Sequence, residues 1–341
     1  MRRLRRWFIV VGAVVLLGFA AAIVLLRQNL TASMSIGGEP VVVDIGAGTS
    51  LRGVAALLAQ QGVLSYPRSF ALYGRFTGRA ARIQAGEYEI RGGTTPLEFL
   101  DQLVSGQVKL YALTVVEGWN LNDLLAALRR HPAVVQTIES ANPVVMAEAL
   151  GLDVGHAEGQ FFPDTYRFPR GTSDVEILSR AHELLRERLG EAWKSRRAGL
   201  PFDTANDLLI LASIVERETA LDEERPLVAG VFVRRLEKRM RLQTDPTVIY
   251  GLGQDFDGNL TRRHLKTDTP YNTYTRRGLP PTPIGLPGEQ SLRAAANPDQ
   301  GAALYFVATG NDDGSHFFTA TLEEHNAAVA KYLVRLRERK N

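Results

Sequence analysis

The longest uninterrupted run of apolar positions lies near the N-terminus. Residues 7–26, WFIVVGAVVLLGFAAAIVLL, carry no charge and follow the basic sequence MRRLRR. As a helix, such a run spans about 30 Å, the thickness of a bilayer core, and the arginines before it should stay cytoplasmic. A cleavable signal peptide is the alternative, but the apolar run continues past the alanines at 20–22. The pattern favours an uncleaved transmembrane helix over 7–27, after a cytoplasmic tail (1–6) and before a polar linker (28–39).

Short apolar runs over residues 40–118 predict a small βααβ-type unit with one further helix. Alternation marks its strands, and Thr49, Ser50 and Thr95 are plausible helix caps. The unit gathers no catalytic residue types, so its pattern indicates a packing or binding module. The predicted strands cover 40–45, 85–90 and 109–118, and the predicted helices cover 50–61, 68–76 and 94–104.

Helical periodicity dominates from residue 119 onward, but after Met240 the chain becomes rich in Pro, Gly, Thr, Tyr and Asn. Long irregular segments of this kind are usually functional. The basic run RRLEKRMR (234–241) is interpreted as a solvated helix face. The predicted fold class is α+β: a transmembrane helix, the βααβ subdomain, then a mainly helical domain over 119–341 with irregular β segments. Its predicted helices cover 120–131, 142–151, 173–195, the apolar stretch around 208–218, and 222–239.

Charge and composition exclude several classes of protein. The net charge is +3, but the first 27 residues hold five arginines and no acid, so the remainder has 35 basic and 37 acidic residues. Without a basic patch interleaved with aromatics, no nucleic-acid partner is expected. The chain has no cysteine, which excludes disulfides, thiol catalysis and zinc–cysteine sites. The histidines lack zinc-site spacing, so neither a metal nor another cofactor is expected.

Two glutamates end the apolar stretch LLILASIVERE. On a helix they point about 200° apart, and Glu218 continues the more apolar stripe through Leu211, Ile214 and Val215. Desolvation there should raise the pKa of Glu218, as a general acid requires. The alternative is an ordinary helix end whose acids are solvated or paired with arginine, and spacing alone favours that alternative. The later motifs change the balance toward Glu218.

Aromatic, amide, hydroxyl and carboxylate side chains recur together in three later segments. This mixture suits an oligosaccharide, because sugar rings lie on aromatic faces while their hydroxyls take directional hydrogen bonds. Each cluster taken alone is also explained by core aromatics or helix caps. The candidate binding residues are Asp164, Gln243, Asp245, Tyr250, Tyr271, Asn272, Tyr274 and His316.

The chain resembles the endolytic murein transglycosylase family, also called MltG or YceG-like. The similarity rests on several motifs in the family's order: VEGW (116–119), EGQFFPDTY (158–166), ASIVERET (212–219), RLQTDPTVIYGLG (241–253), YNTY (271–274), GLPPTPIGLPG (278–288) and LYFVATG…HFFTATLEEHN (304–326).

This resemblance implies a single-pass inner-membrane protein whose 40–118 subdomain is LysM-like and whose 119–341 catalytic domain is periplasmic. It implies that Glu218, the second acid of the E-x-E-T motif, is the catalytic residue. The expected reaction cleaves the bond between N-acetylmuramic acid and N-acetylglucosamine within glycan strands without water, leaving 1,6-anhydro ends and limiting strand elongation. The expected partners are peptidoglycan glycan strands, possible peptidoglycan synthases (penicillin-binding proteins) and the membrane.

Two other functions stay open on the sequence. One is a hydrolytic muramidase in which Asp164 or Asp245 activates water. The other is a membrane-tethered glycan-binding scaffold for wall-synthesis proteins, in which Glu218 has no chemical role. Analysis of product ends separates the two enzymes, and substitution of Glu218 separates both of them from the scaffold.

Overall fold

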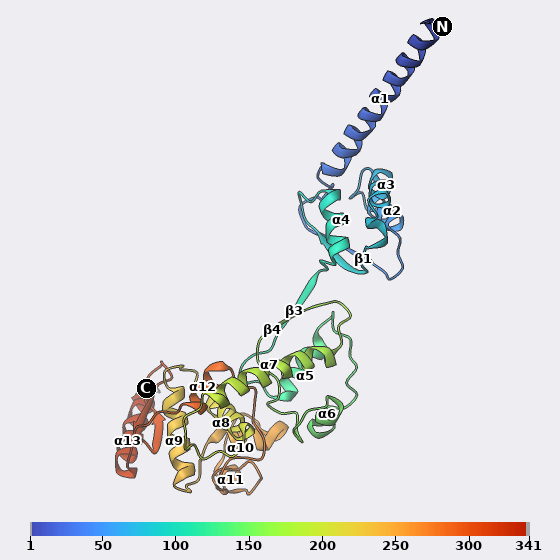
Figure 1. The fold of residues 1–341 in the computed structure, drawn as a ribbon. Coiled ribbons are helices and arrows are strands. Elements are labelled where there is room, and N and C mark those ends of the chain that lie inside the picture. The colour runs from blue at the N-terminus through green and yellow to red at the C-terminus, as the bar shows by residue number, and fades with distance from the viewer. Residues whose placement is uncertain (1, 339–341) are drawn as a thin grey trace. The chain divides into compact units, whose positions relative to one another are not determined.

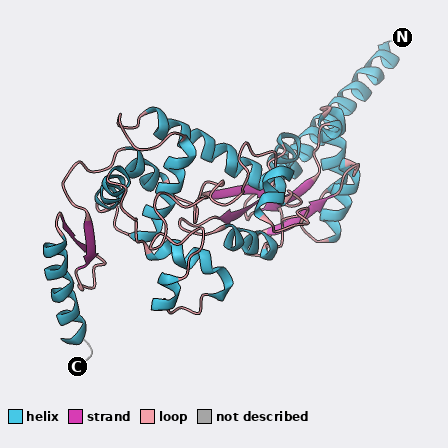
Figure 2. Ribbon diagram, turned by 90° about the horizontal axis from the view of Figure 1, so that it is seen from below, coloured by secondary structure: helices cyan, strands magenta, loops and turns pink. Residues whose placement is uncertain are grey.

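The computed structural model describes residues 2–338. It divides into two compact units: unit 1 runs to Tyr111 and includes Arg167–Gly171, and unit 2 comprises Ala112–Tyr166 and the chain from Thr172 onward. The sequence prediction placed this boundary at 118. Helices dominate the described chain, and its strands form short two-stranded sheets (Figure 2). The architecture is thus mixed helix and sheet with an apolar N-terminal helix, as predicted.

The N-terminal helix α1 (Arg2–Thr31) is long enough and apolar enough to cross a membrane. It covers most of the expected cytoplasmic tail, of which residue 1 lies outside the described residues. The predicted linker, 28–39, is not a free spacer. α1 continues to Thr31, and Leu30 and Met34 are buried in the core of unit 1. Their apolar side chains account for this packing, which the mostly small and polar composition of the segment did not predict.

Unit 1 is built on the antiparallel pair β1–β2, in which Val43 faces Tyr88. Ser50 caps α2 and Thr95 caps α4 through a capping box, as their sequence positions predict. Gly74 lets α3 pass close to α2, because a Cβ there would collide with Leu51. The elements are β1 (Val41–Ile45), α2 (Leu51–Gln60), α3 (Pro67–Phe76), η1 (Arg79–Ala81), β2 (Gly86–Ile90) and α4 (Pro96–Ser105).

The third predicted strand of this region does not join the β1–β2 sheet. β3 (Leu110–Thr114) pairs instead with β4 (Thr165–Pro169) in a separate two-stranded sheet. The register of strand partners is a tertiary choice that alternation alone leaves open.

Unit 2 has helix α8 at the centre of its core. Every residue from 208 to 215 is buried, and α12 packs against α7, α8 and α9 (Figure 1). A helix that is apolar on all sides is buried on all sides. The helices are α5 (Leu121–Arg130), α6 (Pro143–Ala149), α7 (Asp174–Lys194), α8 (Ala205–Glu218), α9 (Arg225–Glu237), α10 (Asp245–Leu252), α11 (Arg262–Lys266) and α12 (Glu289–Ala296), with the 3₁₀ turn η2 (Gly253–Asp255).

The C-terminal segment is more regular than its composition indicated. The antiparallel hairpin β5 (Tyr305–Ala308)–β6 (His316–Thr319) is followed by the helix α13 (Leu322–Glu338). Both β5 and β6 contact α13, and β5 contacts α9. This hairpin and the start of α13 bring side chains to the cavity described below.

Candidate active site

The two acids of the E-x-E-T motif occupy the last turn of α8. A capping box between Thr204 and Asp207 starts the helix, and Thr219 ends it in an extended conformation. Because the preceding turns are fully buried, the chain carries both carboxylates to the edge of the core. Their environments there are different.

Both carboxylate oxygens of Glu216 accept structural hydrogen bonds. Its Oε1 accepts a hydrogen bond from Arg225 Nη2 at 3.1 Å, and its Oε2 accepts one from the backbone N–H of Gly288 at 3.0 Å. Both side chains of the ion pair are at most 7% exposed. Glu216 therefore ties α8 to α9 and to the start of α12, with both oxygens occupied.

Glu218 instead lines a cavity of about 580 Å³. Its Oε1 accepts a hydrogen bond from Thr244 Oγ1, and the described residues place no donor on Oε2. Burial raises the pKa of Glu218 to about 7. Asp245 adds to the rise, while the Thr244 hydrogen bond and Arg235 oppose it. A carboxyl group half protonated near neutrality, with one oxygen open to a cavity, is suited to general acid–base chemistry.

Thr244 is held in place by the first turn of α10 and by the segment that follows α11. Its N–H donates to Thr273 Oγ1 at 3.1 Å, and its carbonyl accepts from Thr247 Oγ1 at 2.8 Å. The preceding residue, Gln243, has a φ of 52°, which a non-glycine residue seldom adopts. Its N–H bonds to Thr273 O at 3.2 Å. These contacts fix the hydroxyl that orients Glu218.

Asp245 and Tyr274 form a second pair in the same cavity. The Tyr274 hydroxyl donates to Asp245 Oδ1 at 2.5 Å. Burial, together with the bond to Asp245 and the nearby Glu218, raises the pKa of Tyr274. The structure thus gathers four of the predicted site residues around one space: Glu218, Gln243, Asp245 and Tyr274.

The other five predicted residues lie outside this cavity lining. Asn272 is fully buried, and its amide donates to the carbonyls of residues 264, 265 and 267, which shapes the loop. Tyr271 bonds Thr282, and its ring lies 4.9 Å from that of Tyr250. Asp164 is exposed, and its Oδ1 accepts from Thr165 N. These partners give the residues local structural roles.

The two remaining predicted residues, Tyr250 and His316, are hydrogen-bonded to the buried glutamates Glu158 and Glu224. Tyr250 donates to the buried Glu158 at 3.1 Å. Glu224 accepts bonds from the backbone N–H of His316 at 2.7 Å and from its Nδ1 at 2.6 Å. Both contacts anchor segments that are distant in sequence.

Several cavity residues were missed by sequence reasoning. The solvated interpretation of the basic run is wrong for Arg235, which is 7% exposed and bonds the carbonyls of Leu304 and Leu242, although positions 237–239 and 241 are exposed. Its guanidinium lies over the Tyr305 ring, on which His325 also stacks. Three of the missed residues, Leu322, His325 and Asn326, would share one face if 322–326 had been interpreted as a helix. The missed lining residues are Arg235, Leu242, Tyr305, Phe306, Val307, Leu322, His325 and Asn326.

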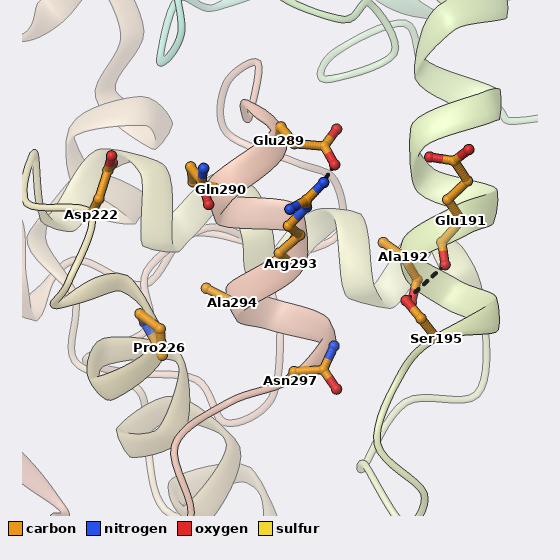
Figure 3. A pocket seen from close by; sticks show the side chains of 10 residues that line it. All are labelled: Glu191, Ala192, Ser195, Asp222, Pro226, Glu289, Gln290, Arg293, Ala294 and Asn297. Carbon is orange, nitrogen blue, oxygen red and sulfur yellow. Dashed lines mark hydrogen bonds and ion pairs between the residues drawn. The ribbon is translucent and has the colours of Figure 1, made fainter.

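A second hollow, of about 440 Å³, lies among α7, α9 and α12 (Figure 3). Its charged side chains have ion-pair partners: Glu289 accepts from Arg293 at 2.8 Å, and Arg188, which lies outside the lining, is within ion-pair distance of Glu191 and Glu289. Glu218 does not line it. The hollow is a surface feature of helix packing, and the candidate chemistry stays with the first cavity.

The chain matches the model of the YceG-like family over residues 43–331. It is 32% identical over 310 residues to a Bacillus subtilis protein named endolytic murein transglycosylase, covering 86% of this chain and 85% of that protein. A Streptococcus pneumoniae protein of the same name is 25% identical over 326 residues, covering 86% of this chain and 58% of that longer protein. The crystal structure of a YceG-like protein from Listeria monocytogenes is similar, with a TM-score of 0.50, 28% identity and coverage of 85% and 99%.

Proposed function

We propose that this chain, which belongs to the YceG-like family, is an endolytic murein transglycosylase: a lyase that cuts peptidoglycan glycan strands. The observation that carries the proposal is the state of Glu218. This carboxyl group lines the cavity, has its pKa raised to about 7 by burial, and keeps Oε2 unbonded by the described residues. The neighbouring acid, Glu216, has none of this freedom.

Glu218 acts in two steps on an N-acetylmuramic acid–N-acetylglucosamine linkage. Its protonated carboxyl donates to the linking oxygen as the C1–O bond breaks, and the electron pair of that bond stays on the departing sugar. The resulting carboxylate takes the proton of the muramic C6 hydroxyl, whose oxygen bonds to C1. The product carries a 1,6-anhydro ring, Glu218 is protonated again, and no water is consumed.

The rest of the cavity binds the sugars. Tyr274, Tyr305 and Phe306 supply ring faces, and Gln243 and Asn326 supply amide groups for sugar hydroxyls. Asp245 contributes negative charge beside the positive C1 centre that develops in the transition state. Thr244 fixes the carboxyl orientation through Oε1.

A hydrolytic muramidase is the second candidate because Asp245 lines the same cavity as Glu218. The structure gives Asp164 no place in that cavity, so this alternative rests on Asp245 alone. In it, Asp245 activates a water molecule while Glu218 protonates the leaving group.

Mass spectrometry of the products from purified glycan strands tests both candidates. Anhydro ends from the wild type, with no product from Glu218→Gln, support the transglycosylase. Reducing ends that disappear in Asp245→Asn identify the muramidase. Cleavage by Glu218→Gln at the wild-type rate contradicts the role of Glu218 in both, and absence of cleavage by the wild type leaves the glycan-binding scaffold.

The wider biological role extends the same proposal. The apolar α1 anchors the chain in the inner membrane with unit 2 on the periplasmic side, unit 1 is LysM-like, and cleavage limits strand elongation beside peptidoglycan synthases. Cells carrying Glu218→Gln should then have longer glycan strands, measured by chromatography of strands freed of peptide. Unchanged strand lengths would contradict that role without affecting the assigned chemistry.

A further inference from the structure

The segment between β1 and β2 has a strongly asymmetric charge. From residue 45 to residue 86 the chain contains five arginines and neither aspartate nor glutamate. The rest of the chain after residue 27 has 30 basic and 37 acidic residues, so this positive charge is local to the region of α2, α3 and η1. The arginines are Arg52, Arg68, Arg75, Arg79 and Arg82.

Three of these arginines border a groove of about 1020 Å³ between α2 and α3. Alanines from both helices line it, including Ala55 and Ala71, and no acidic residue does. Arg52, Arg68 and Arg75 are exposed and make no ion pair with any described residue, whereas Arg79 pairs with Asp101 at 2.8 Å. The groove therefore offers unneutralised guanidinium groups above an apolar floor.

The outer face of α3 adds exposed apolar side chains to this charge. Leu72 is 50% exposed and Phe76 is 82% exposed. Together with Arg68 and Arg75 they stand at positions i, i+4, i+7 and i+8 of one helix, so they share a face. Mixed basic and apolar faces of this kind are typical of helices that lie at a membrane interface.

Contacts within unit 1 place α3 beside the end of the apolar helix. Asn29 Nδ2 of α1 donates to Ser69 Oγ of α3 at 3.3 Å, and α1 packs against α3 and α4. The apolar run ends at Leu26, three residues before Asn29, a rise of about 4.5 Å. If α1 spans a bilayer, the first turn of α3, with Arg68, is held at the depth of the lipid headgroups.

We propose that the α2–α3 groove and its arginine rim dock onto the anionic phospholipid headgroups of the membrane that α1 spans. Guanidinium groups bind phosphate oxygens in a bidentate way, and Leu72 and Phe76 enter the interface beside them. Tethering by α1 keeps the headgroups at high effective concentration, so individually weak contacts suffice. This docking restricts the orientation of unit 1 on the membrane, and it rests on α1 as an uncleaved anchor.

A single fluorescent label on the full chain tests the proposal. The chain has no cysteine, so Gln60→Cys, at the exposed end of the groove, can be labelled uniquely. The labelled protein is reconstituted into vesicles of phosphatidylcholine alone, or with a third of the lipid replaced by phosphatidylglycerol, each containing lipids with a headgroup quencher. We expect roughly twofold stronger quenching on the anionic vesicles, lost in about 1 M salt, where the Debye length is only ~3 Å.

Matched double substitutions locate the effect. Arg68→Gln with Arg75→Gln should abolish the extra quenching, while Arg129→Gln with Arg130→Gln, an exposed pair on α5 with the same charge change, should keep it. Equal quenching on both vesicles, or equal loss in both double variants, would overturn the proposal. Protection of the label by an acidic peptide on neutral vesicles would assign the groove to a protein partner and also overturn it.

Activity controls separate this proposal from the proposed enzyme function. Both double variants should cleave glycan strands in detergent at the wild-type rate, which also shows that they fold. The readout is the distance of a label from lipid, so it is independent of whether Glu218 is catalytic.

Discussion

Unit 2 holds two glutamates whose pKa values are both raised to about 7, and they differ in their hydrogen bonds and in their access to a cavity. Glu158 is 2% exposed and accepts bonds from the N–H groups of Leu121 and Gly159 and from the Tyr250 hydroxyl. Burial is the largest cause of its raised pKa, as it is for Glu218. Glu218 has one fixed oxygen and faces a cavity. A raised pKa therefore marks desolvation, and access to a ligand decides which carboxyl can do chemistry.

The largest expected effect tests this difference directly. Glu218→Gln should lower glycan cleavage by about 10²–10⁴-fold, the usual contribution of a general acid–base group, without loss of fold. Glu158→Gln should change cleavage less than tenfold at pH 6, where Glu158 is already mostly protonated. Rates on purified strands and circular dichroism of both variants measure this. A greater loss of activity in Glu158→Gln would reverse our assignment.

The Glu216–Arg225 pair should show the largest effect on stability. Arg225→Leu leaves the buried Glu216 carboxylate without its cation, which costs about 3–5 kcal/mol. Arg293→Leu is the control, because its pair with Glu289 is exposed and worth at most about 1 kcal/mol. Urea unfolding followed by circular dichroism compares the two. Similar losses would show that the buried pair has no special role.

Glu158 and Glu218 should contribute equally to the pH dependence of the free energy of unfolding. Each has a folded-state pKa near 7, raised from 4.5, so each resists ionisation when folded. Their contribution to the free energy of unfolding is full below pH 4.5 and is lost as pH rises to 7, by at most about 3 kcal/mol each. Either Gln variant should flatten that decline in urea titrations at several pH values. A decline unchanged in both variants would show that neither pKa is raised.

The smallest effects concern the pH profile of cleavage. Because the acid must be protonated, the rate should fall above pH 7, roughly tenfold per pH unit. Thr244→Val removes a bond that lowers the Glu218 pKa, so the falling limb should move to higher pH. Asp245→Asn removes a charge that raises it, so the limb should move to lower pH. Shifts of the limb in the same direction in both variants would contradict opposite effects of Thr244 and Asp245 on the Glu218 pKa.

Local chemistry made much of unit 1 predictable. Ser50 and Thr95 cap their helices because their side chains accept backbone N–H groups that have no partner within the helix. The same reasoning missed the fate of strand 110–114, since its partner lies more than fifty residues away. The burial of Met34 was missed because a polar neighbourhood outweighed one apolar side chain.

The candidate site followed the same division. The stripe argument separated Glu218 from Glu216, and the polar clusters pointed to Gln243, Asp245 and Tyr274. Asn272 and His316 also have side chains suited to binding sugar hydroxyls. In the structure, however, Asn272 bonds loop carbonyls and His316 bonds Glu224. Arg235 was interpreted as solvated. The carbonyl that offsets its desolvation comes from Leu304, in a distant segment that the local sequence pattern does not reveal.

The sequence by itself determined the apolar N-terminal helix, the buried α8 and the two acids at its end, because helical periodicity and length depend on neighbours in the chain. Only the tertiary structure decided that Glu216 is locked to Arg225 while Glu218 meets Thr244 and the C-terminal hairpin. These partners lie from a few to about a hundred residues away. Desolvation and hydrogen bonding, which set the reactivity of a carboxyl group, depend on what surrounds it in space.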